Sequence, residues 1–389
     1  MRYGKQDERL VLYPEGRLTS NNAESVWQEI SRIIGSGGQG ALTLDCEKLE
    51  YVSSAGLRLF IRLKKTVPDM ELVNVSSEIY DILEMTGLTE MITTRKSYRT
   101  ISVEGCDVIG RGANGNVYRI DRETVVKVFL APESLDEIHR ERELARTALI
   151  MGVPTAIPYD VVRIESGGYG SVFELIEANS FSNLIASGRL TIGEAAKKSI
   201  DLLKEMHTLV PKADTLPRMK DRMLPRAQRL RGTVSDPAHE KLVSLIEAVP
   251  DDPHLLHGDY HINNILQQKD ELMLIDMDTL CTGHPIFELA LMRCAYRGFT
   301  EMDHAEAMHY FGISYDSVRE FWRLSLEEYI GASGDVETAE KKAELLSCMR
   351  LLDHAVRKFG KDSETGKKWI SHFAPRLEEL AEEIDELTF

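Results

Sequence analysis

Cysteine is scarce in this 389-residue sequence, and the five cysteines present are scattered. Cys46, Cys106, Cys281, Cys294 and Cys348 form no C-x-x-C pair, which argues against a structural zinc site or a disulfide framework and suits a reducing cytosol. No apolar run reaches the length that spans a membrane, and the first ten residues lack the apolar core of a signal peptide. We therefore expect a cytoplasmic protein with no membrane-bound segment.

Positive charge is also in short supply, with 47 Lys and Arg against 63 Asp and Glu and a net charge of −16. Residues 1–100 hold 13 basic and 14 acidic residues, so the remainder holds 34 and 49. Such a surface disfavours nucleic acid and anionic membranes as partners and would attract a cationic substrate. An acidic surface that only keeps the protein soluble explains the imbalance equally well.

The first hundred residues alternate between short apolar strands and helical patterns. Strands are expected near 10–13, 41–44 and 71–75, with helical periodicity between them. This alternation predicts a small α/β domain in which helices pack on a sheet. The segments LEYVSSAGLRLF and YDILEMTGLTEM resemble STAS domains, the fold of anti-sigma-factor antagonists. We place a STAS-like domain at residues 1–98, with a regulatory or protein-binding role implied by the resemblance.

Ser54 falls on the position that carries a regulatory serine in STAS domains. The resemblance makes Ser54 a candidate for phosphorylation, and free N–H groups at a helix start would favour a phosphate there. The Asp of the family turn is replaced by Ser53 in this sequence. The sequence favours the structural alternative, in which Ser54 is the N-cap of the next helix.

A glycine-rich segment follows the first domain. Gly110, Gly112 and Gly115 form a G-x-G-x-x-G pattern, and the β-branched and aromatic stretch after it predicts a hairpin where a dinucleotide site would need a helix. The glycines would let the backbone approach phosphates, and Lys127 on the second strand would neutralise them. A lysine within an apolar strand needs an acidic partner.

Two acids on the next predicted helix, residues 135–151, could pair with that lysine: Glu141 and Glu143 both occur in HREREL. The sequence alone leaves both open, and a solvated helix face is the alternative for either acid.

The segment 255–278, LLHGDYHINNILQQKDELMLIDMD, is the most informative stretch of the chain. It reads as a tight turn followed by a β-hairpin. A hairpin places the residue before its first strand beside the residue after its second, so Asn264 and Asp276 should lie together, with Asp259 just ahead. Amide and carboxylate oxygens suit Mg²⁺, and a second carboxylate can accept a proton from an attacking hydroxyl.

The pattern H-G-D-x-H-x-x-N followed by I-D-x-D resembles the aminoglycoside phosphotransferase and choline kinase group, relatives of the protein kinases. The resemblance implies an α+β bilobal protein-kinase-like fold, with the smaller lobe at 99–177 and a helical lobe at 178–389. It also implies ATP and Mg²⁺ as cofactors. Asp259 would be the catalytic base, and Asn264 and Asp276 would be the magnesium ligands.

The same resemblance extends to the nucleotide site. Counting forward from Lys127 favours Glu143 as its partner, with Glu141 as the fallback. Backbone groups of Ile176 and Ala178 would bind adenine. Glu288 stands where the family usually has the Asp of Asp-Leu-Ala, which leaves one scaffold contact open.

The chain lacks the D-F-G motif and long activation segment of a protein kinase, so a small hydroxyl-bearing acceptor is favoured. Its surface charge would allow that acceptor to be cationic. One alternative is a protein serine kinase that acts on Ser54 or on a partner's STAS domain. Another is a nucleotide-sensing interaction module without catalysis.

Overall fold

The computed structural model describes the chain except residues 7–8, 38–39, 112–114, 130–134 and 214. Gly112 therefore lies outside the described residues. The chain folds as two compact units, Met1–Ser102 with Val161–Gly167, and Val103–Asp160 with Gly168–Phe389. Within the described ranges, every helix is too short or too polar to cross a membrane.

The first unit is built on a five-stranded sheet in the order β1-β2-β4-β6-β7, in which only β1 and β2 are antiparallel. Parallel neighbours need crossovers, and the predicted helices supply them. The elements are β1 (Arg2–Gln6), β2 (Arg9–Tyr13), β3 (Gly16–Leu18), α1 (Ala23–Gly37), β4 (Leu42–Asp45), β5 (Leu49–Val52), α2 (Ser54–Thr66), β6 (Met70–Val75), α3 (Ser77–Met85), α4 (Leu88–Met91) and β7 (Thr93–Lys96). This confirms the predicted α/β domain.

Helix α2 has Ser53 at its N-cap position, one residue before the predicted cap, Ser54. Ser53 occupies the N-cap position with extended backbone, and its hydroxyl makes no capping bond. Ser54 is the first helical residue and is exposed. The expectation that Ser54 caps the helix is therefore wrong, because the backbone enters the helical conformation one residue earlier than the sequence pattern suggested.

The first unit extends to Ser102, beyond the predicted boundary at residue 98, and takes in Val161–Gly167. Strand β8 (Thr100–Ile101) pairs in parallel with β12 (Pro158–Ile164) through Arg163 and Ile164. Pairing over about sixty residues leaves no local pattern in the sequence, so this boundary could not be found from composition.

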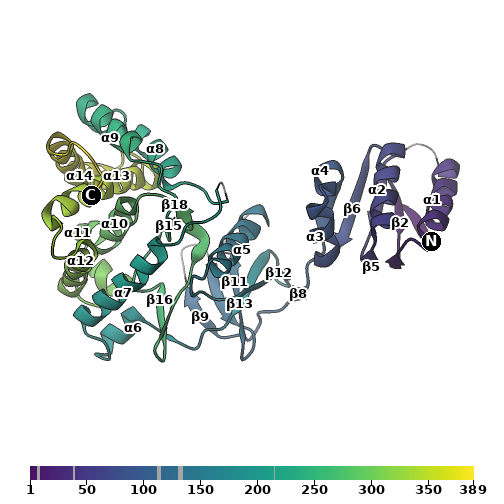
Figure 1. The fold of residues 1–389 in the computed structure, drawn as a ribbon, viewed down its shortest axis with the longest axis horizontal. Helices are drawn as coiled ribbons and strands as arrows, with labels where there is room; N and C mark the ends of the chain where they lie inside the picture. The colour runs from purple at the N-terminus through teal and green to yellow at the C-terminus, as the bar shows by residue number, and fades with distance from the viewer. Residues whose placement is uncertain (7–8, 38–39, 112–114, 130–134, 214) are drawn as a thin grey trace. The chain divides into compact units, whose positions relative to one another are not determined.

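The second unit has a strand-rich lobe and a helical lobe (Figure 1). The strands of the strand-rich lobe follow the order β13-β11-β10-β9 in a six-stranded sheet that begins with β8 and β12. Its further strands and its helix are β9 (Val108–Arg111), β10 (Gly115–Arg119), β11 (Thr124–Phe129), α5 (Leu135–Ile150) and β13 (Tyr169–Glu174). Antiparallel pairing of β9 with β10 and of β10 with β11 confirms the predicted hairpin after the glycine-rich segment.

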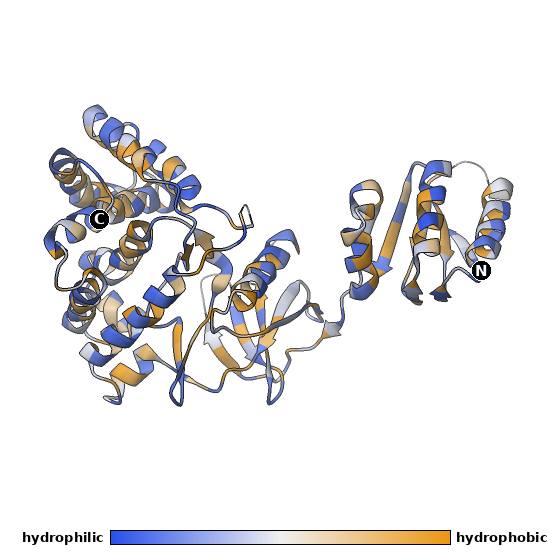
Figure 2. Cartoon of the chain, in the orientation of Figure 1, coloured by the Kyte–Doolittle hydropathy of each residue, from blue (hydrophilic) through white to orange (hydrophobic). Residues whose placement is uncertain are grey.

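The helical lobe encloses the largest hydrophobic core of the chain. In Figure 2 its helices show both hydrophobic and hydrophilic residues, as expected of amphipathic helices. They are α6 (Phe181–Ala186), α7 (Ile192–His207), α8 (Met219–Gln228), α9 (Asp236–Ala248), α10 (Pro285–Arg293), α11 (Phe299–Met302), α12 (Tyr315–Ile330), α13 (Val336–His354) and α14 (Glu364–Glu383). Short π-helical segments extend or join several of them, including Ala307–Phe311.

The remaining short strands of the second unit form two small sheets. Strand β14 (Asn179–Ser180) pairs with β16 (Ile265–Gln268), which forms a hairpin with β17 (Glu271–Leu274), and β15 (Leu255–Leu256) pairs with β18 (Cys281–Thr282). The predicted hairpin after Asn264 is therefore confirmed.

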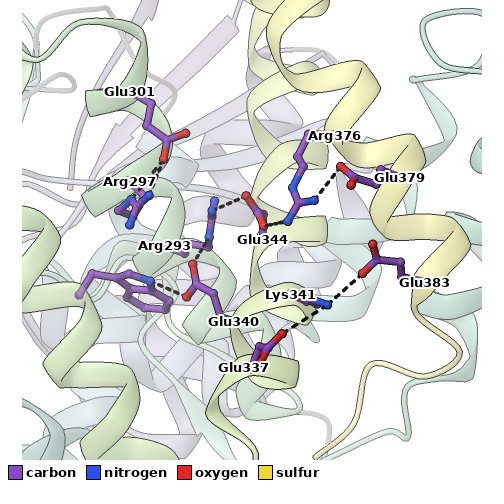
Figure 3. A network of polar contacts seen from close by, with 11 residues as sticks. Arg293, Arg297, Glu301, Glu337, Glu340, Lys341, Glu344, Arg376, Glu379 and Glu383 are labelled. Atoms are coloured by element: carbon purple, nitrogen blue, oxygen red, sulfur yellow. Dashed lines mark hydrogen bonds and ion pairs between the residues drawn. The ribbon is translucent and has the colours of Figure 1, made fainter.

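A network of ion pairs joins α10, α13 and α14 (Figure 3). Arg293 is 2% exposed and donates to Glu340 at 2.9 Å and to Glu344 at 2.6 Å. The indole N–H of Trp322 donates to the other oxygen of Glu340 at 2.7 Å. Arg376 on α14 binds Glu344 at 2.6 Å. Each buried charge is thus paired and hydrogen-bonded, the condition under which burial of an ion is tolerated.

Replacing Arg293 by Ala should lower the free energy of unfolding by about 3–5 kcal/mol, because two carboxylates would lose the cation that compensates their burial. Chemical denaturation measures this loss. The matched control is Arg323→Ala, which removes an exposed pair with Glu327 and should cost less than about 1 kcal/mol. Equal losses in the two variants would contradict this account of the network.

Candidate active site

The β16–β17 hairpin brings Asn264 and Asp276 to one end, as its register requires. Ile265 pairs with Leu274, and the Ile275 N–H donates to the Asn264 carbonyl at 3.0 Å. Asp276 follows directly, with a left-handed backbone at φ 66°. The Asn264 amide donates to the backbone carbonyl of Asp259 at 3.0 Å. The amide and the two carboxylate residues therefore belong to one connected cluster.

Lys127 reaches this cluster from β11. Its ammonium lies 2.9 Å from an Asp276 oxygen and 2.8 Å from a Glu141 oxygen. Burial opposes the charged form, but the two carboxylates outweigh it and hold the pKa of Lys127 above its ordinary value. The lysine therefore stays charged and joins the sheet of the strand-rich lobe to the hairpin of the helical lobe.

The lysine's partner is Glu141, so the expected pairing with Glu143 is wrong and the fallback is correct. Glu141 shares the buried face of α5 with Ile138 and Ala145, at helical spacings of three and four. Glu143 is rotated away from that face and pairs with Arg142 at 3.1 Å. The number of residues from Lys127 does not distinguish Glu141 from Glu143. The helical spacing of the apolar residues does, because it places Glu141 on the buried face of the helix.

Gly110 and Gly115, both predicted to approach phosphates, lie on β9 and β10. A Cβ on Gly115 would come within 2.5 Å of the Val128 carbonyl, so close packing of β10 on β11 requires glycine there. Gly110 has ordinary contacts, with Val117 3.4 Å from its would-be Cβ. Strand packing thus gives a reason for glycine at position 115, in addition to its predicted approach to phosphates.

The predicted adenine-binding segment follows β13. The Ala178 N–H donates to the Ile176 carbonyl at 2.9 Å, so the donor and acceptor expected to meet a base already lie side by side. The intervening Glu177 is held through its side chain by Arg119 at 3.3 Å and through its carbonyl by Gln268.

The turn that carries Asp259 is held by a buried carboxylate. Glu288 is fully buried and accepts the N–H groups of His257 at 2.6 Å and Gly258 at 3.1 Å. Gly258 has φ +83°, and a Cβ there would lie 2.6 Å from the Thr279 carbonyl. The longer Glu at the position where the family usually has Asp therefore still serves as a scaffold contact.

Asp259 itself is half exposed, and its charge is stabilised by histidines. Burial alone would raise its pKa, but His261, His257 and the cation Arg350 lower the pKa below its ordinary value. His261 is buried, with its Nε2 2.9 Å from the Tyr310 hydroxyl and 3.5 Å from an Asp259 oxygen. Asp259 is thus ionised at neutral pH and able to accept a proton.

Two residues near Asp259 complete the polar cluster. Burial and the neighbouring Asp276 raise the pKa of Asp278 to about 7. Tyr310 was not predicted, because it lies in the π-helical segment Ala307–Phe311, far from every motif in the sequence. In the structure its hydroxyl contacts His261 and its carbonyl accepts the Asn263 amide at 2.7 Å.

The fold and this cluster define a kinase-like phosphotransferase. Over residues 106–321, 216 of the 389 residues, the chain matches the model of the phosphotransferase enzyme family. Over residues 2–101 it matches the STAS domain. The chain belongs to the phosphotransferase enzyme family and carries an N-terminal STAS domain.

Individual known proteins are similar to the STAS domain or to the phosphotransferase domain. BtrV of Bordetella bronchiseptica, named as an anti-sigma factor antagonist, is 26% identical over 97 residues, which is 24% of this chain and 83% of that protein. The ADP-bound aminoglycoside phosphotransferase APH(2″)-Ib is 20% identical with a TM-score of 0.51, covering 80% of this chain and 99% of its own. The streptomycin–ATP complex of APH(2″)-IIa has a TM-score of 0.50, 20% identity and coverages of 80% and 98%. At this identity the two structures establish the fold.

Replacing Glu288 by Gln should destabilise the protein by about 1–3 kcal/mol, because an amide cannot accept both backbone N–H groups without turning a donor toward them. Thermal unfolding measures the loss. Glu337→Gln, at an 84% exposed side chain, is the control and should leave stability nearly unchanged. A Glu288 variant as stable as this control would show that the turn does not depend on the carboxylate.

Proposed function

We propose that the enzyme transfers the γ-phosphate of ATP to the hydroxyl of a small molecule with the help of Mg²⁺. The observation that carries this proposal is the position of Lys127, which reaches Glu141 and Asp276 together. In phosphoryl transfer a lysine held by a helix acid neutralises the phosphates while a carboxylate binds the metal that bridges them.

The residues present suit a magnesium ion. Asn264 and Asp276 offer an amide and a carboxylate oxygen, the hard ligands that Mg²⁺ takes, and phosphate oxygens and water would complete its octahedron. Among the described residues no three His, Cys, Asp or Glu side chains are grouped to hold a metal alone. Asp278, two residues beyond Asp276, adds negative potential beside this site.

The chemical step assigned to the protein is proton acceptance. Asp259 is ionised, and its half-exposed carboxylate can accept the hydroxyl proton of an acceptor placed in line with the γ-phosphate. Gly115, with Gly110 and Gly112, would bring the backbone to the phosphates, and Ile176 and Ala178 would bind adenine. One of the two structural neighbours is bound to ADP and the other is a complex with ATP, which agrees with a nucleotide cofactor.

Replacing Asp259 by Asn should lower kcat by a factor of about 10²–10⁴, because the base is lost while the binding groups remain. Replacing Asp276 by Asn should abolish magnesium-dependent nucleotide binding. Coupled detection of ADP across a panel of amino alcohols, aminoglycosides, polyols and sugar phosphates measures the first effect, and calorimetry with ADP measures the second. Arg323→Ala, remote from the cluster, is the control. ATP turnover that survives both changes would refute the proposal.

The STAS domain supports a second role, protein binding, and Ser54 is exposed at the start of α2. If the domain is also a phosphate acceptor, incubation with ATP should label Ser54, and the label should vanish in Asp259→Asn. Mass spectrometry of the intact chain decides this. If the wild-type chain carries no phosphate on Ser54 after incubation with ATP, Ser54 is not an acceptor of the enzyme.

A further inference from the structure

Arginine side chains gather where α8 packs on α13. Arg222 and Arg226 are one helical turn apart on α8 and therefore share a face. Farther along, the Arg229 guanidinium binds the buried Asp353 of α13 at 2.7 Å and joins the two helices. Arg350 stands three residues before Asp353 and so lies on the same side of α13.

This cluster adjoins the turn that carries Asp259. Arg222 donates to the Thr279 carbonyl at 2.6 Å, the same atom that a Cβ on Gly258 would meet. The Thr279 hydroxyl in turn donates to the His257 carbonyl at 2.8 Å. From the other helix, the charge of Arg350 acts on Asp259 and lowers the pKa of its carboxyl. Arg222 therefore lies beside the turn that carries the proposed base, and Arg226 follows one helical turn later on the same face of α8.

Their positive charge exceeds the negative charge available to balance it. The guanidinium groups of Arg350 and Arg222 and the carboxylate of Asp353 act on Arg226, and Arg229 already binds that carboxylate at 2.7 Å. Arg226 has only a weak contact, 3.8 Å to the sulfur of Met223, and Arg350 has neither a hydrogen bond nor an ion pair within the part of the chain that the structure describes. Burial, with repulsion from Arg350 and Arg222, lowers the pKa of Arg226 to about 10.

Structural roles account for two of these arginines only. Arg222 secures Thr279, and Arg229 joins the helices. Arg226 and Arg350 are half-buried cations without such a partner, in a chain whose net charge is −16. Holding like charges together at partial burial is costly unless an anion joins them.

We propose that Arg226 and Arg350 bind an anionic group, a phosphate or a carboxylate, on the molecule whose hydroxyl meets Asp259. Guanidinium groups suit both anions because their planar N–H pairs match two oxygens at once. The inference rests on the proposed phosphotransfer and specifies its acceptor as a hydroxylated acid or phosphate ester. A cationic group elsewhere on the acceptor is compatible with this site.

The test uses the full chain saturated with ADP and Mg²⁺, so that the nucleotide's own phosphate sites are filled. Inorganic phosphate or ribose 5-phosphate is added at constant ionic strength, and thermal unfolding is followed. Binding to the native state should raise Tm by about 2–4 °C at saturating probe. The rise should disappear in Arg226→Gln and in Arg350→Gln and persist in Arg231→Gln, the matched control, because Arg231 is exposed beyond the end of α8.

The charge-retaining variants Arg226→Lys and Arg350→Lys separate loss of the anion site from loss of folding, since they should keep part of the rise. With a turned-over anionic acceptor, each Gln variant should raise the acceptor KM about tenfold or more, whereas the KM for ATP should change less than twofold.

The anion site would be overturned by the absence of a probe-dependent rise in the ADP-bound wild type, or by a rise that the Arg226→Gln and Arg350→Gln variants retain. Preference for a neutral polyol over its phosphate ester would do the same. Failure of the proposed function looks different, because the protein would then show no Asp259-dependent ATP turnover with any acceptor, whatever its response to phosphate.

Discussion

The ion pairs of Lys127 hold the catalytic half of this protein together. The lysine is anchored by Glu141 on α5 and reaches Asp276 after β17, which is 149 positions away in the sequence. A half-buried cation between two carboxylates is stable only while both remain close, so the strand-rich lobe and the hairpin must keep their geometry. Under the proposed function, Asp276 would hold the metal ion that bridges the nucleotide's phosphates.

Around that interaction, the turn of Asp259 is shaped by backbone contacts more than by its own side chains. Glu288 accepts two successive N–H groups, and Gly258 provides the conformation that brings Thr279 into contact. His261 and Tyr310 then orient the carboxylate region from the helical side. If Asp259 is the base, as proposed, a carboxylate positioned in this way would need little rearrangement when a substrate hydroxyl arrives.

The charge distribution on the two sides of Asp259 differs. Toward the strand-rich lobe lie the acids that suit a metal ion and the lysine that balances them. Toward α8 and α13 lie arginines in excess, although the chain as a whole is acidic. The net charge of the chain is therefore a poor guide to the charge of the acceptor. The whole surface sets the long-range potential, whereas a few residues set the charge next to the reacting atoms. The STAS domain adds a second α/β unit to the chain.

Features that depend on neighbours along the chain can be predicted from the amino-acid sequence alone. These are the α/β alternation of the first unit, the hairpin that joins Asn264 to Asp276, and the presence of a lysine that needs an acid. Other features depend on how distant elements pack. These are the pairing of Lys127 with Glu141, the contact of Tyr310 with His261, and the pairing of β8 with β12. Such packing also brings Arg350 to Asp259 from a helix about ninety residues away. Hydrogen-bond register and helix periodicity are local, whereas these contacts arise from packing between elements whose separation leaves no pattern in the sequence.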